Sequence, residues 1–177
     1  HRRRTGGDPA HGRDIALLPL RRHQHELQQR RHRHEDRDFF LLDAAEHRWI
    51  EELGGMNIFF VFEDGSLQTP PLSGTILPGI TRDSLLTLAR EEGLVVREER
   101  YAIDQWEADC TSGRVVEAFA CGTAAVVTPI GKVSSPSGSF TVGAGGPGQV
   151  TQRLKERLVG IQRGSAVDPH NWVMRLD

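Results

Sequence analysis

Past residue 38 the chain alternates between short apolar runs and segments whose apolar residues recur at helical spacing. Short apolar runs rich in β-branched and aromatic residues, and closed by turn residues, are typical of buried strands. The run 58–62, which ends at the turn 63–66, is the clearest example, and residues 67–69 return from it as far as two prolines. Further strands are expected at 39–42, 94–99, 115–121 and 126–130.

Helical spacing marks two other segments, and a capping pattern marks a third. The leucines and the alanine of residues 83–92 share one face ahead of Gly93, as in an amphipathic helix that ends at a glycine. Between 150 and 161 apolar residues recur at intervals of four, four and three. Asp104 with Glu107 three places on resembles a capping box and predicts a helix start. Strands alternating with helices predict a mixed α/β fold.

Composition divides the chain near residue 39. Residues 1–38 hold ten arginines against six acidic residues, a net charge of about +4, whereas the rest of the chain carries about −6. Six of the eight histidines also precede residue 35. A segment this polar buries too little apolar surface to offset its ordering entropy, so disorder or a loose helix is expected there.

Three functions compete for this basic arm. The pairs His23/His25 and His32/His34 resemble metal ligands, but alternate residues point apart on a helix. The arginines can contact nucleic-acid phosphates, yet no aromatic residue is interleaved to stack on bases. A solvated segment without a specific partner is therefore favoured, and neither a metal site nor nucleic-acid binding is expected.

The cysteines and the hydropathy place the chain among cytoplasmic proteins. Cys110 and Cys121 show neither metal-ligand spacing nor a disulfide framework, which fits a reducing compartment. No apolar stretch reaches membrane-spanning length and no signal peptide is visible, so no membrane partner is expected. Because the sequence begins with His rather than Met, we expect a fragment or a processed product.

An acidic pair stands ahead of the clearest strand. Glu51 and Glu52 precede Gly54 and Gly55, where the absence of a Cβ lets a backbone or a flat ligand come close. Either carboxylate can serve a cationic ligand group, or both can be ordinary surface acids.

Two other glycine-containing turns expose backbone N–H groups. The turn 78–79 leads into a helix, where the N–H groups of Ile80, Thr81 and Arg82 form either an anion site or an ordinary helix start. The turn 122–125 is either an oxyanion or phosphate seat or a plain hairpin tip. The glycine-rich loop 143–148 lacks the lysine of a P-loop and is expected to lead into the last helix.

Three motifs taken together resemble the C-terminal half of the branched-chain amino acid aminotransferases, which are pyridoxal-phosphate enzymes of class IV, or fold type IV. The similarity runs over roughly 135 residues, from about Leu41 to Asp177. The motifs are Glu52-Leu53-Gly54-Gly55-Met56-Asn57, Leu77-Pro78-Gly79-Ile80-Thr81-Arg82 and Cys121-Gly122-Thr123-Ala124-Ala125. The resemblance implies the large α/β (α+β mixed) domain of that fold over residues 39–177, with the domain incomplete.

The resemblance also implies roles for matching residues. Glu52 would face the pyridine nitrogen of pyridoxal 5'-phosphate and keep it protonated, which leaves Glu51 as a neighbour. Ile80 and Thr81 would hold the cofactor phosphate, and Thr123 would add a further phosphate contact. Thr123 and Ala124 would present N–H groups to the substrate carboxylate. Asn57 would brace the loop that carries Glu52.

One departure from the family concerns the Schiff-base lysine. Such chemistry needs a lysine that bonds the cofactor and shuttles the proton. The family carries it upstream of the glutamate motif, whereas this chain has only Lys132, expected in a Gly-Lys turn, and Lys155, expected on the polar side of the last helix. No catalytic lysine is therefore expected. Residues 1–38 stand in its place, and their Arg/His bias resembles a reading frame translated out of register.

The expected parent reaction exchanges the amino group of leucine, isoleucine or valine with 2-oxoglutarate, by a ping-pong route in a homodimer. D-amino acid aminotransferase and aminodeoxychorismate lyase are rivals within the fold group. The alternative from another class is an inactive fragment whose basic arm binds nucleic acid or nothing.

Overall fold

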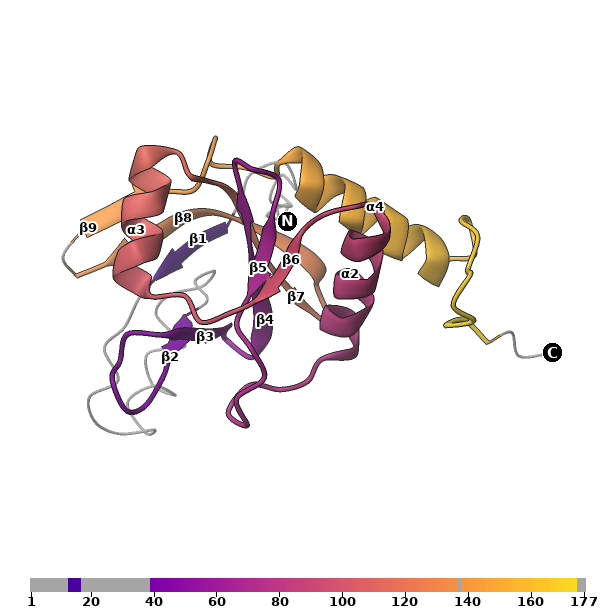
Figure 1. The fold of residues 1–177 in the computed structure, drawn as a ribbon, viewed down its shortest axis with the longest axis horizontal. Coiled ribbons are helices and arrows are strands. Elements are labelled where there is room, and N and C mark those ends of the chain that lie inside the picture. The colour runs from indigo at the N-terminus through magenta and orange to yellow at the C-terminus, as the bar shows by residue number, and fades with distance from the viewer. Residues whose placement is uncertain (1–12, 17–38, 137, 175–177) are drawn as a thin grey trace, which may run out of the picture.

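The computed structural model describes residues 13–16, 39–136 and 138–174. Its strands and helices follow one another along the chain (Figure 1). They are β1 (Arg13–Ala16), β2 (Phe40–Leu42), β3 (Ile50–Leu53), β4 (Met56–Phe62), β5 (Leu67–Thr69), α2 (Ile80–Glu91), β6 (Val96–Glu98), α3 (Ile103–Ser112), β7 (Val115–Gly122), β8 (Val126–Ser135), β9 (Gly138–Thr141) and α4 (Gln149–Gln162). The expected mixed α/β fold is confirmed.

The strands of the described residues form one sheet whose main path runs β1-β8-β7-β4-β3-β2. The longest pairing is the antiparallel one between β4 and β7, and each of these strands also belongs to an antiparallel hairpin, β3–β4 and β7–β8. β4 lies between β3 and β7, and β5 and β6 extend the sheet beside it. This arrangement brings the glycine turns of the first and third motifs to the same region of the sheet.

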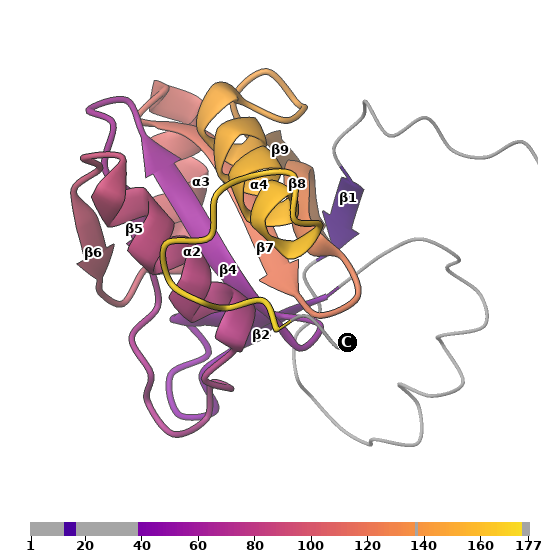
Figure 2. The same ribbon diagram turned by 90° about the vertical axis from the view of Figure 1, so that its right-hand side faces the viewer.

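Helices cover both faces of the sheet: α3 lies on one side, and α2 and α4 lie on the other (Figure 2). Successive side chains of a strand point to opposite faces. In β4, Phe60 therefore packs with Trp106 of α3, with ring centroids 5.0 Å apart, whereas Phe59 stacks on Phe119 at 5.0 Å in the cluster that includes α2 and α4. The continuous apolar run of β4 is a strand buried on both faces.

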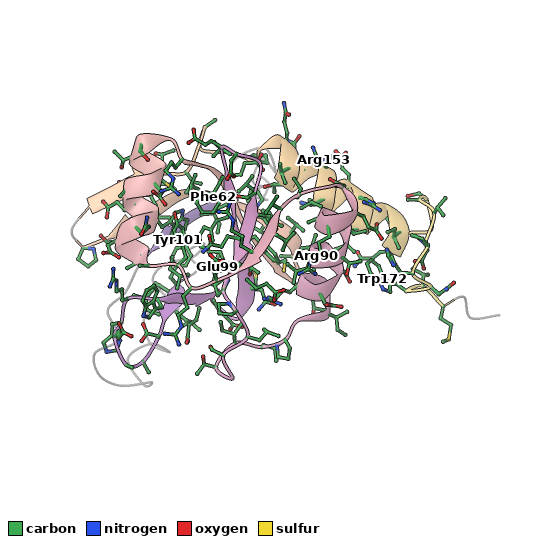
Figure 3. All side chains as sticks on the ribbon, in the orientation of Figure 1. Phe62, Arg90, Glu99, Tyr101, Arg153 and Trp172 are labelled. Carbon is green, nitrogen blue, oxygen red and sulfur yellow. The ribbon has the colours of Figure 1, made fainter. Side chains whose placement is uncertain are left out.

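Aromatic residues fill the core beneath α3. Tyr101 and Phe62 meet edge-on at 5.8 Å on the side of the molecule that α3 covers (Figure 3). The Tyr101 hydroxyl donates to the buried Asp109 at 2.6 Å, and burial first and then this bond raise the pKa of Tyr101 far above its ordinary value. These contacts fix α3 against the sheet.

Several sequence predictions needed correction. The helix predicted from residue 83 begins at Ile80, so the first-turn N–H groups belong to the helix itself. The predicted capping box at Asp104 is wrong, because α3 begins one residue earlier without a side-chain cap, and the Asp104 side chain pairs with Arg48 at 3.6 Å. β8 runs on to Ser135 and is followed by β9, which the sequence did not predict.

The arm before residue 39 contains one described element. Residues Arg13–Ala16 form β1, which pairs in parallel with β8, so the expectation of disorder or a loose helix is wrong for these four residues. The histidine pairs at 23/25 and 32/34 lie outside the described residues. Across the part of the chain that the structure describes, no group of His, Cys, Asp or Glu is arranged to hold a metal ion, and no helix is long and apolar enough to cross a membrane.

Candidate functional site

The β3–β4 hairpin places the first motif. Glu52 of β3 is the cross-strand partner of Asn57 of β4, and Gly54 and Gly55 form the turn between them with φ of 57° and 96°. Such positive φ values suit glycine, because a Cβ there would be strained. The hairpin therefore sets the Glu52 carboxylate and the Asn57 amide side by side near one end of the sheet.

The Glu52 carboxylate is buried, with 7% of the residue exposed, and is hydrogen-bonded to the second motif. Its Oε1 accepts the backbone N–H of Leu77 at 2.9 Å and lies 3.5 Å from Asn57 Nδ2. The same Asn57 Nδ2 donates to the Leu77 carbonyl at 3.0 Å. Asn57 thus joins the glutamate to the loop that leads into α2. Among the described residues, Glu52 Oε2 accepts no hydrogen bond, whereas Oε1 accepts those given above.

Gly79 lets that loop pass close to Asn57. A Cβ on residue 79 would lie 2.4 Å from Asn57 Oδ1, which is closer than side chains tolerate. The φ of Gly79 is an ordinary −71°, so contact rather than backbone conformation demands glycine here. The need for this glycine comes from the tertiary structure.

The first turn of α2 is open. Ile80 is 86% exposed, Thr81 is half-buried, and no side chain of the described residues accepts their N–H groups. Unpaired first-turn N–H groups at the positive end of a helix dipole attract an anion. The structure thus leaves the N–H groups of Ile80 and Thr81 without a side-chain acceptor, three and four residues after Leu77, which contacts Glu52.

The start of α4 shows the alternative arrangement. Glu117 of β7 is buried and accepts the N–H of Val150 at 3.0 Å, the N–H of Thr151 at 2.8 Å and the Thr151 hydroxyl at 2.7 Å. A protein carboxylate therefore already occupies the anion position of α4. By comparison, α2 has no such internal partner in the described structure.

The third motif is the β7–β8 turn. Cys121 pairs with Asn57 across the sheet, and Gly122 pairs with Val126. A Cβ on Gly122 would lie 3.2 Å from Met56 Cγ, so the first and third motifs pack directly. Thr123 and Ala124 are exposed at the tip, where their hydroxyl and N–H groups are open to a ligand. The three motifs meet at one end of the sheet.

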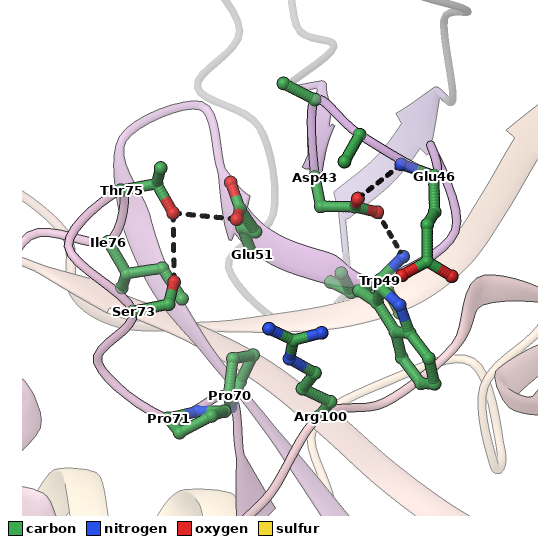
Figure 4. Close-up of a pocket in the computed structure, with 13 residues that line it drawn as sticks. Asp43, Glu46, Trp49, Glu51, Pro70, Pro71, Ser73, Thr75, Ile76 and Arg100 are labelled. Carbon is green, nitrogen blue, oxygen red and sulfur yellow. Dashed lines mark hydrogen bonds between the residues drawn. The ribbon is translucent and has the colours of Figure 1, made fainter.

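The two glutamates of β3 serve opposite faces. Glu51 Oε1 accepts the Thr75 hydroxyl at 2.7 Å and borders a pocket of about 430 Å³ that also includes Trp49 and Arg100 (Figure 4). Glu52 does not line this pocket. Neighbouring residues of a strand point to opposite faces, and here that separates Glu51 from the converged motifs.

Both lysines lie away from the converged motifs. Lys132 is within β8, opposite Thr141 of β9, so the predicted Gly-Lys turn is wrong. It lies six residues beyond Val126 at the turn, which is roughly 20 Å along a strand. Lys155 is exposed on α4, as predicted.

The two cysteines differ in exposure, Cys121 being buried and Cys110 half-buried, but both thiols have a raised pKa. Burial, the main cause in each case, raises the pKa of the Cys110 and Cys121 thiols to about 12, and the Arg82 charge partly opposes the rise at Cys121. Because the thiolate is the nucleophile, we expect the folded chain to react very slowly with a thiol reagent at pH 8. Two thiols should react at once after denaturation. Fast labelling of the folded chain would contradict this packing.

The sequence did not indicate three contacts of this region. These are the Leu77 N–H bonded to Glu52, the buried side chain of Arg82, and the capping of α4 by Glu117. Each joins residues far apart in the sequence, so no local pattern contained it. The signal that was available is the polar residue inside an apolar strand, as at Glu117 in 115–121.

Comparison with known proteins gives one consistent result. The pattern of the family Amino-transferase class IV matches residues 19–133. The chain is 51% identical over 139 residues to the branched-chain-amino-acid aminotransferase of Mycolicibacterium smegmatis, and 53% identical over 138 residues to that of Mycobacterium tuberculosis. These alignments cover 77% and 76% of this chain but only 38% of each relative.

The fold agrees with that result. The crystal structure of the branched-chain amino acid aminotransferase of Escherichia coli superposes with a TM-score of 0.73 at 29% identity, over 92% of this chain and 56% of that chain. The chain thus spans well under half the length of the relatives in sequence and about half of the solved protein.

Proposed function

The chain belongs to the class IV amino-transferase family, and from this premise we propose that it is the cofactor-binding part of a branched-chain amino acid aminotransferase. The parent would exchange the amino group of leucine, isoleucine or valine with 2-oxoglutarate. The names of the two mycobacterial relatives support this substrate class over the D-amino acid and aminodeoxychorismate alternatives. The observation that carries the proposal is the meeting of the three motifs around the buried Glu52.

The residues present fit pyridoxal phosphate. Glu52 offers a buried carboxylate with one oxygen free, α2 offers N–H groups without a partner among the described side chains, and Thr123 offers an exposed hydroxyl. A pyridine nitrogen, a phosphate and a carboxylate are the groups that such a set can hold. When bound, the cofactor supplies an electron-withdrawing ring that carries the amino group.

Each proposed contact follows from the chemistry of its residue. Glu52 Oε2 would accept the ring N–H and hold its proton, while Oε1 stays bonded to Leu77 and fixes the carboxylate in place. The N–H groups of Ile80 and Thr81, with the Thr81 hydroxyl, would donate to the phosphate. Thr123 would add a phosphate contact, and the N–H groups at Thr123 and Ala124 would orient the substrate carboxylate.

We propose that this chain binds the cofactor without a covalent bond. Its two lysines lie roughly 20 Å along a strand from the turn and on the exposed face of α4, respectively. Residues 1–38 are proposed to be foreign to the family, although the family match begins at residue 19 and so includes residues 19–38. The parent is proposed to be a cytoplasmic homodimer.

A binding experiment tests the seat directly. Pyridoxamine phosphate and pyridoxamine differ only in the phosphate, and neither has an aldehyde that can react with a lysine. We expect the 177-residue chain to bind pyridoxamine phosphate several-fold more tightly in equilibrium dialysis, with inorganic phosphate competing. Equal affinity for both ligands would contradict the proposed phosphate seat.

A further inference from the structure

We propose that Arg82 is a positioning residue, whose buried guanidinium fixes the first turn of α2 so that the Ile80 and Thr81 N–H groups face the cofactor phosphate. This inference rests on the proposed function, because it concerns the phosphate seat assigned there. It adds a residue that touches neither the phosphate nor the substrate.

The burial pattern of α2 shows what holds its first turn. Ile80 is 86% exposed and Asp83 is exposed, whereas Arg82 is only 4% exposed. Apolar packing of the helix begins only at Leu85. The deepest side chain of the first turn is therefore a charged one, and its polar contacts have to supply the anchoring that apolar side chains supply elsewhere.

Arg82 makes those contacts to the ends of two strands. Its Nη2 donates to the Pro70 carbonyl at 3.0 Å and to Glu98 Oε2 at 2.9 Å. Pro70 directly follows β5, where the Thr69 hydroxyl donates to the Ile58 carbonyl of β4 at 2.7 Å, and Glu98 is the last residue of β6. The helix start is thereby tied to the ends of β5 and β6.

The charge of Arg82 also lies near the third motif. It acts on the buried thiol of Cys121, the residue that precedes the turn carrying Thr123 and Ala124. The hydrogen bond from Arg82 lowers the pKa of the Glu98 carboxyl, with Arg90 contributing less, so the pair is charged at neutral pH.

The geometry explains why its loss would affect the phosphate. Hydrogen bonds weaken steeply once donor and acceptor leave about 2.7–3.2 Å or lose their alignment. The N–H groups of Ile80 and Thr81 stay oriented toward the phosphate only if the first turn of α2 does not tilt. The loop 71–79 adds three bonds to the neighbouring strands: the Leu77 N–H to Glu52 at 2.9 Å, Asn57 Nδ2 to the Leu77 carbonyl at 3.0 Å, and the Thr75 hydroxyl to Glu51 at 2.7 Å. These bonds hold the loop, whereas Arg82 holds the helical turn that follows it.

The experiment compares Arg82→Met with Arg90→Met in the whole chain. Arg90 donates to the same Glu98, at 2.9 Å, but from the last turn of α2 (Figure 3). We expect R82M to lower the ratio of pyridoxamine phosphate to pyridoxamine affinity by roughly five-fold or more, as loss of charge-assisted hydrogen bonds implies. R90M should leave the ratio unchanged, and Arg82→Lys should restore part of it.

The outcomes separate this inference from the proposed function. If wild type fails to distinguish the two ligands, the proposed seat is wrong, and Arg82 is then tested by hydrogen exchange of residues 83–86, whose N–H groups are the first of α2 to be hydrogen-bonded. Faster exchange in R82M but not in R90M supports the positioning role. An unchanged ligand ratio in R82M, or equal exchange in both variants, overturns it. If R82M does not fold, R82K and Glu98→Gln replace it in the same comparison.

Discussion

Glu52→Gln is expected to weaken binding of pyridoxamine phosphate by roughly 5- to 30-fold, because a charge-assisted hydrogen bond becomes a neutral one at a cost of about 1–2 kcal/mol. Glutamine keeps an oxygen that can accept the Leu77 N–H, now 2.9 Å from Glu52 Oε1, so the loop should stay in place. Equilibrium dialysis at neutral pH measures the change. Binding of pyridoxamine should be weakened by the same factor, since the contact between Glu52 and the ring does not involve the phosphate.

Glu51→Gln is the matched control for that change. Glu51 is the next residue of the same strand, but it bonds to Thr75 on the other face. We expect its substitution to alter ligand affinity less than about two-fold, in line with a partly exposed hydrogen bond. If E51Q weakens binding and E52Q does not, the assignment of the ring-nitrogen partner is reversed.

Glu117→Ala is expected to lower the free energy of unfolding by about 3 kcal/mol or more, because three donors at the start of α4 lose their buried acceptor. The donors are the N–H groups of Val150 and Thr151 and the Thr151 hydroxyl. Removing a helix cap costs about 0.5–2 kcal/mol in ordinary cases, and the burial of this one increases the loss. Urea denaturation followed by circular dichroism measures it.

Two further variants test the cause of that loss. Glu156→Ala removes an exposed carboxylate from the same helix and should change stability by less than about 0.5 kcal/mol. Gly148→Ala should be destabilising alone, since its Cβ would lie 2.0 Å from Glu117 Cδ, and less so in combination with E117A. Strict additivity of the two changes would show that Glu117 does not occupy this position.

The starts of α2 and α4 differ in whether a protein side chain accepts their first-turn N–H groups. Both α2 and α4 begin after a glycine without a side-chain cap from that residue. The difference is made by β7, which supplies Glu117 to α4, whereas no described side chain accepts the first-turn N–H groups of α2. This supports α2 as the helix whose start is left for a ligand.

Local pattern was sufficient where periodicity and burial coincide. The apolar run of β4 and the 150–161 stripe of α4 were predicted because each residue's neighbours in sequence decide which face it joins. The order of the three motifs likewise sufficed for the family. The motifs at 52–57, 77–82 and 121–125 follow one another in the sequence, so their order could be seen without the fold.

The predictions of local structure failed where a contact with a segment distant in sequence decides the conformation. Gly131 and Lys132 resemble a turn, yet Lys132 pairs with Thr141 of β9 and the Gly131 carbonyl accepts the Val142 N–H at 3.0 Å, so β8 continues through both residues. Asp104 resembles a helix cap, yet its carboxylate pairs with Arg48 from another segment. In both cases a contact between residues distant in sequence outweighs a weak local preference.

The Glu52 segment also separates what the sequence determines from what only the tertiary structure decides. The sequence by itself determined that two adjacent carboxylates precede a buried strand. The structure showed that they lie in a strand of their own, β3, and therefore face opposite sides. Only the tertiary structure decided which side carries the converged motifs, because Leu77, Gly79 and Gly122 reach Glu52 and its hairpin through chain folding. The burial of Arg82 belongs to the same class, since a lone arginine in a helix start has no local signal for burial. Its acceptors at Pro70 and Glu98 come from two other strands, and hydrogen bonds to such acceptors are what make a buried charge stable.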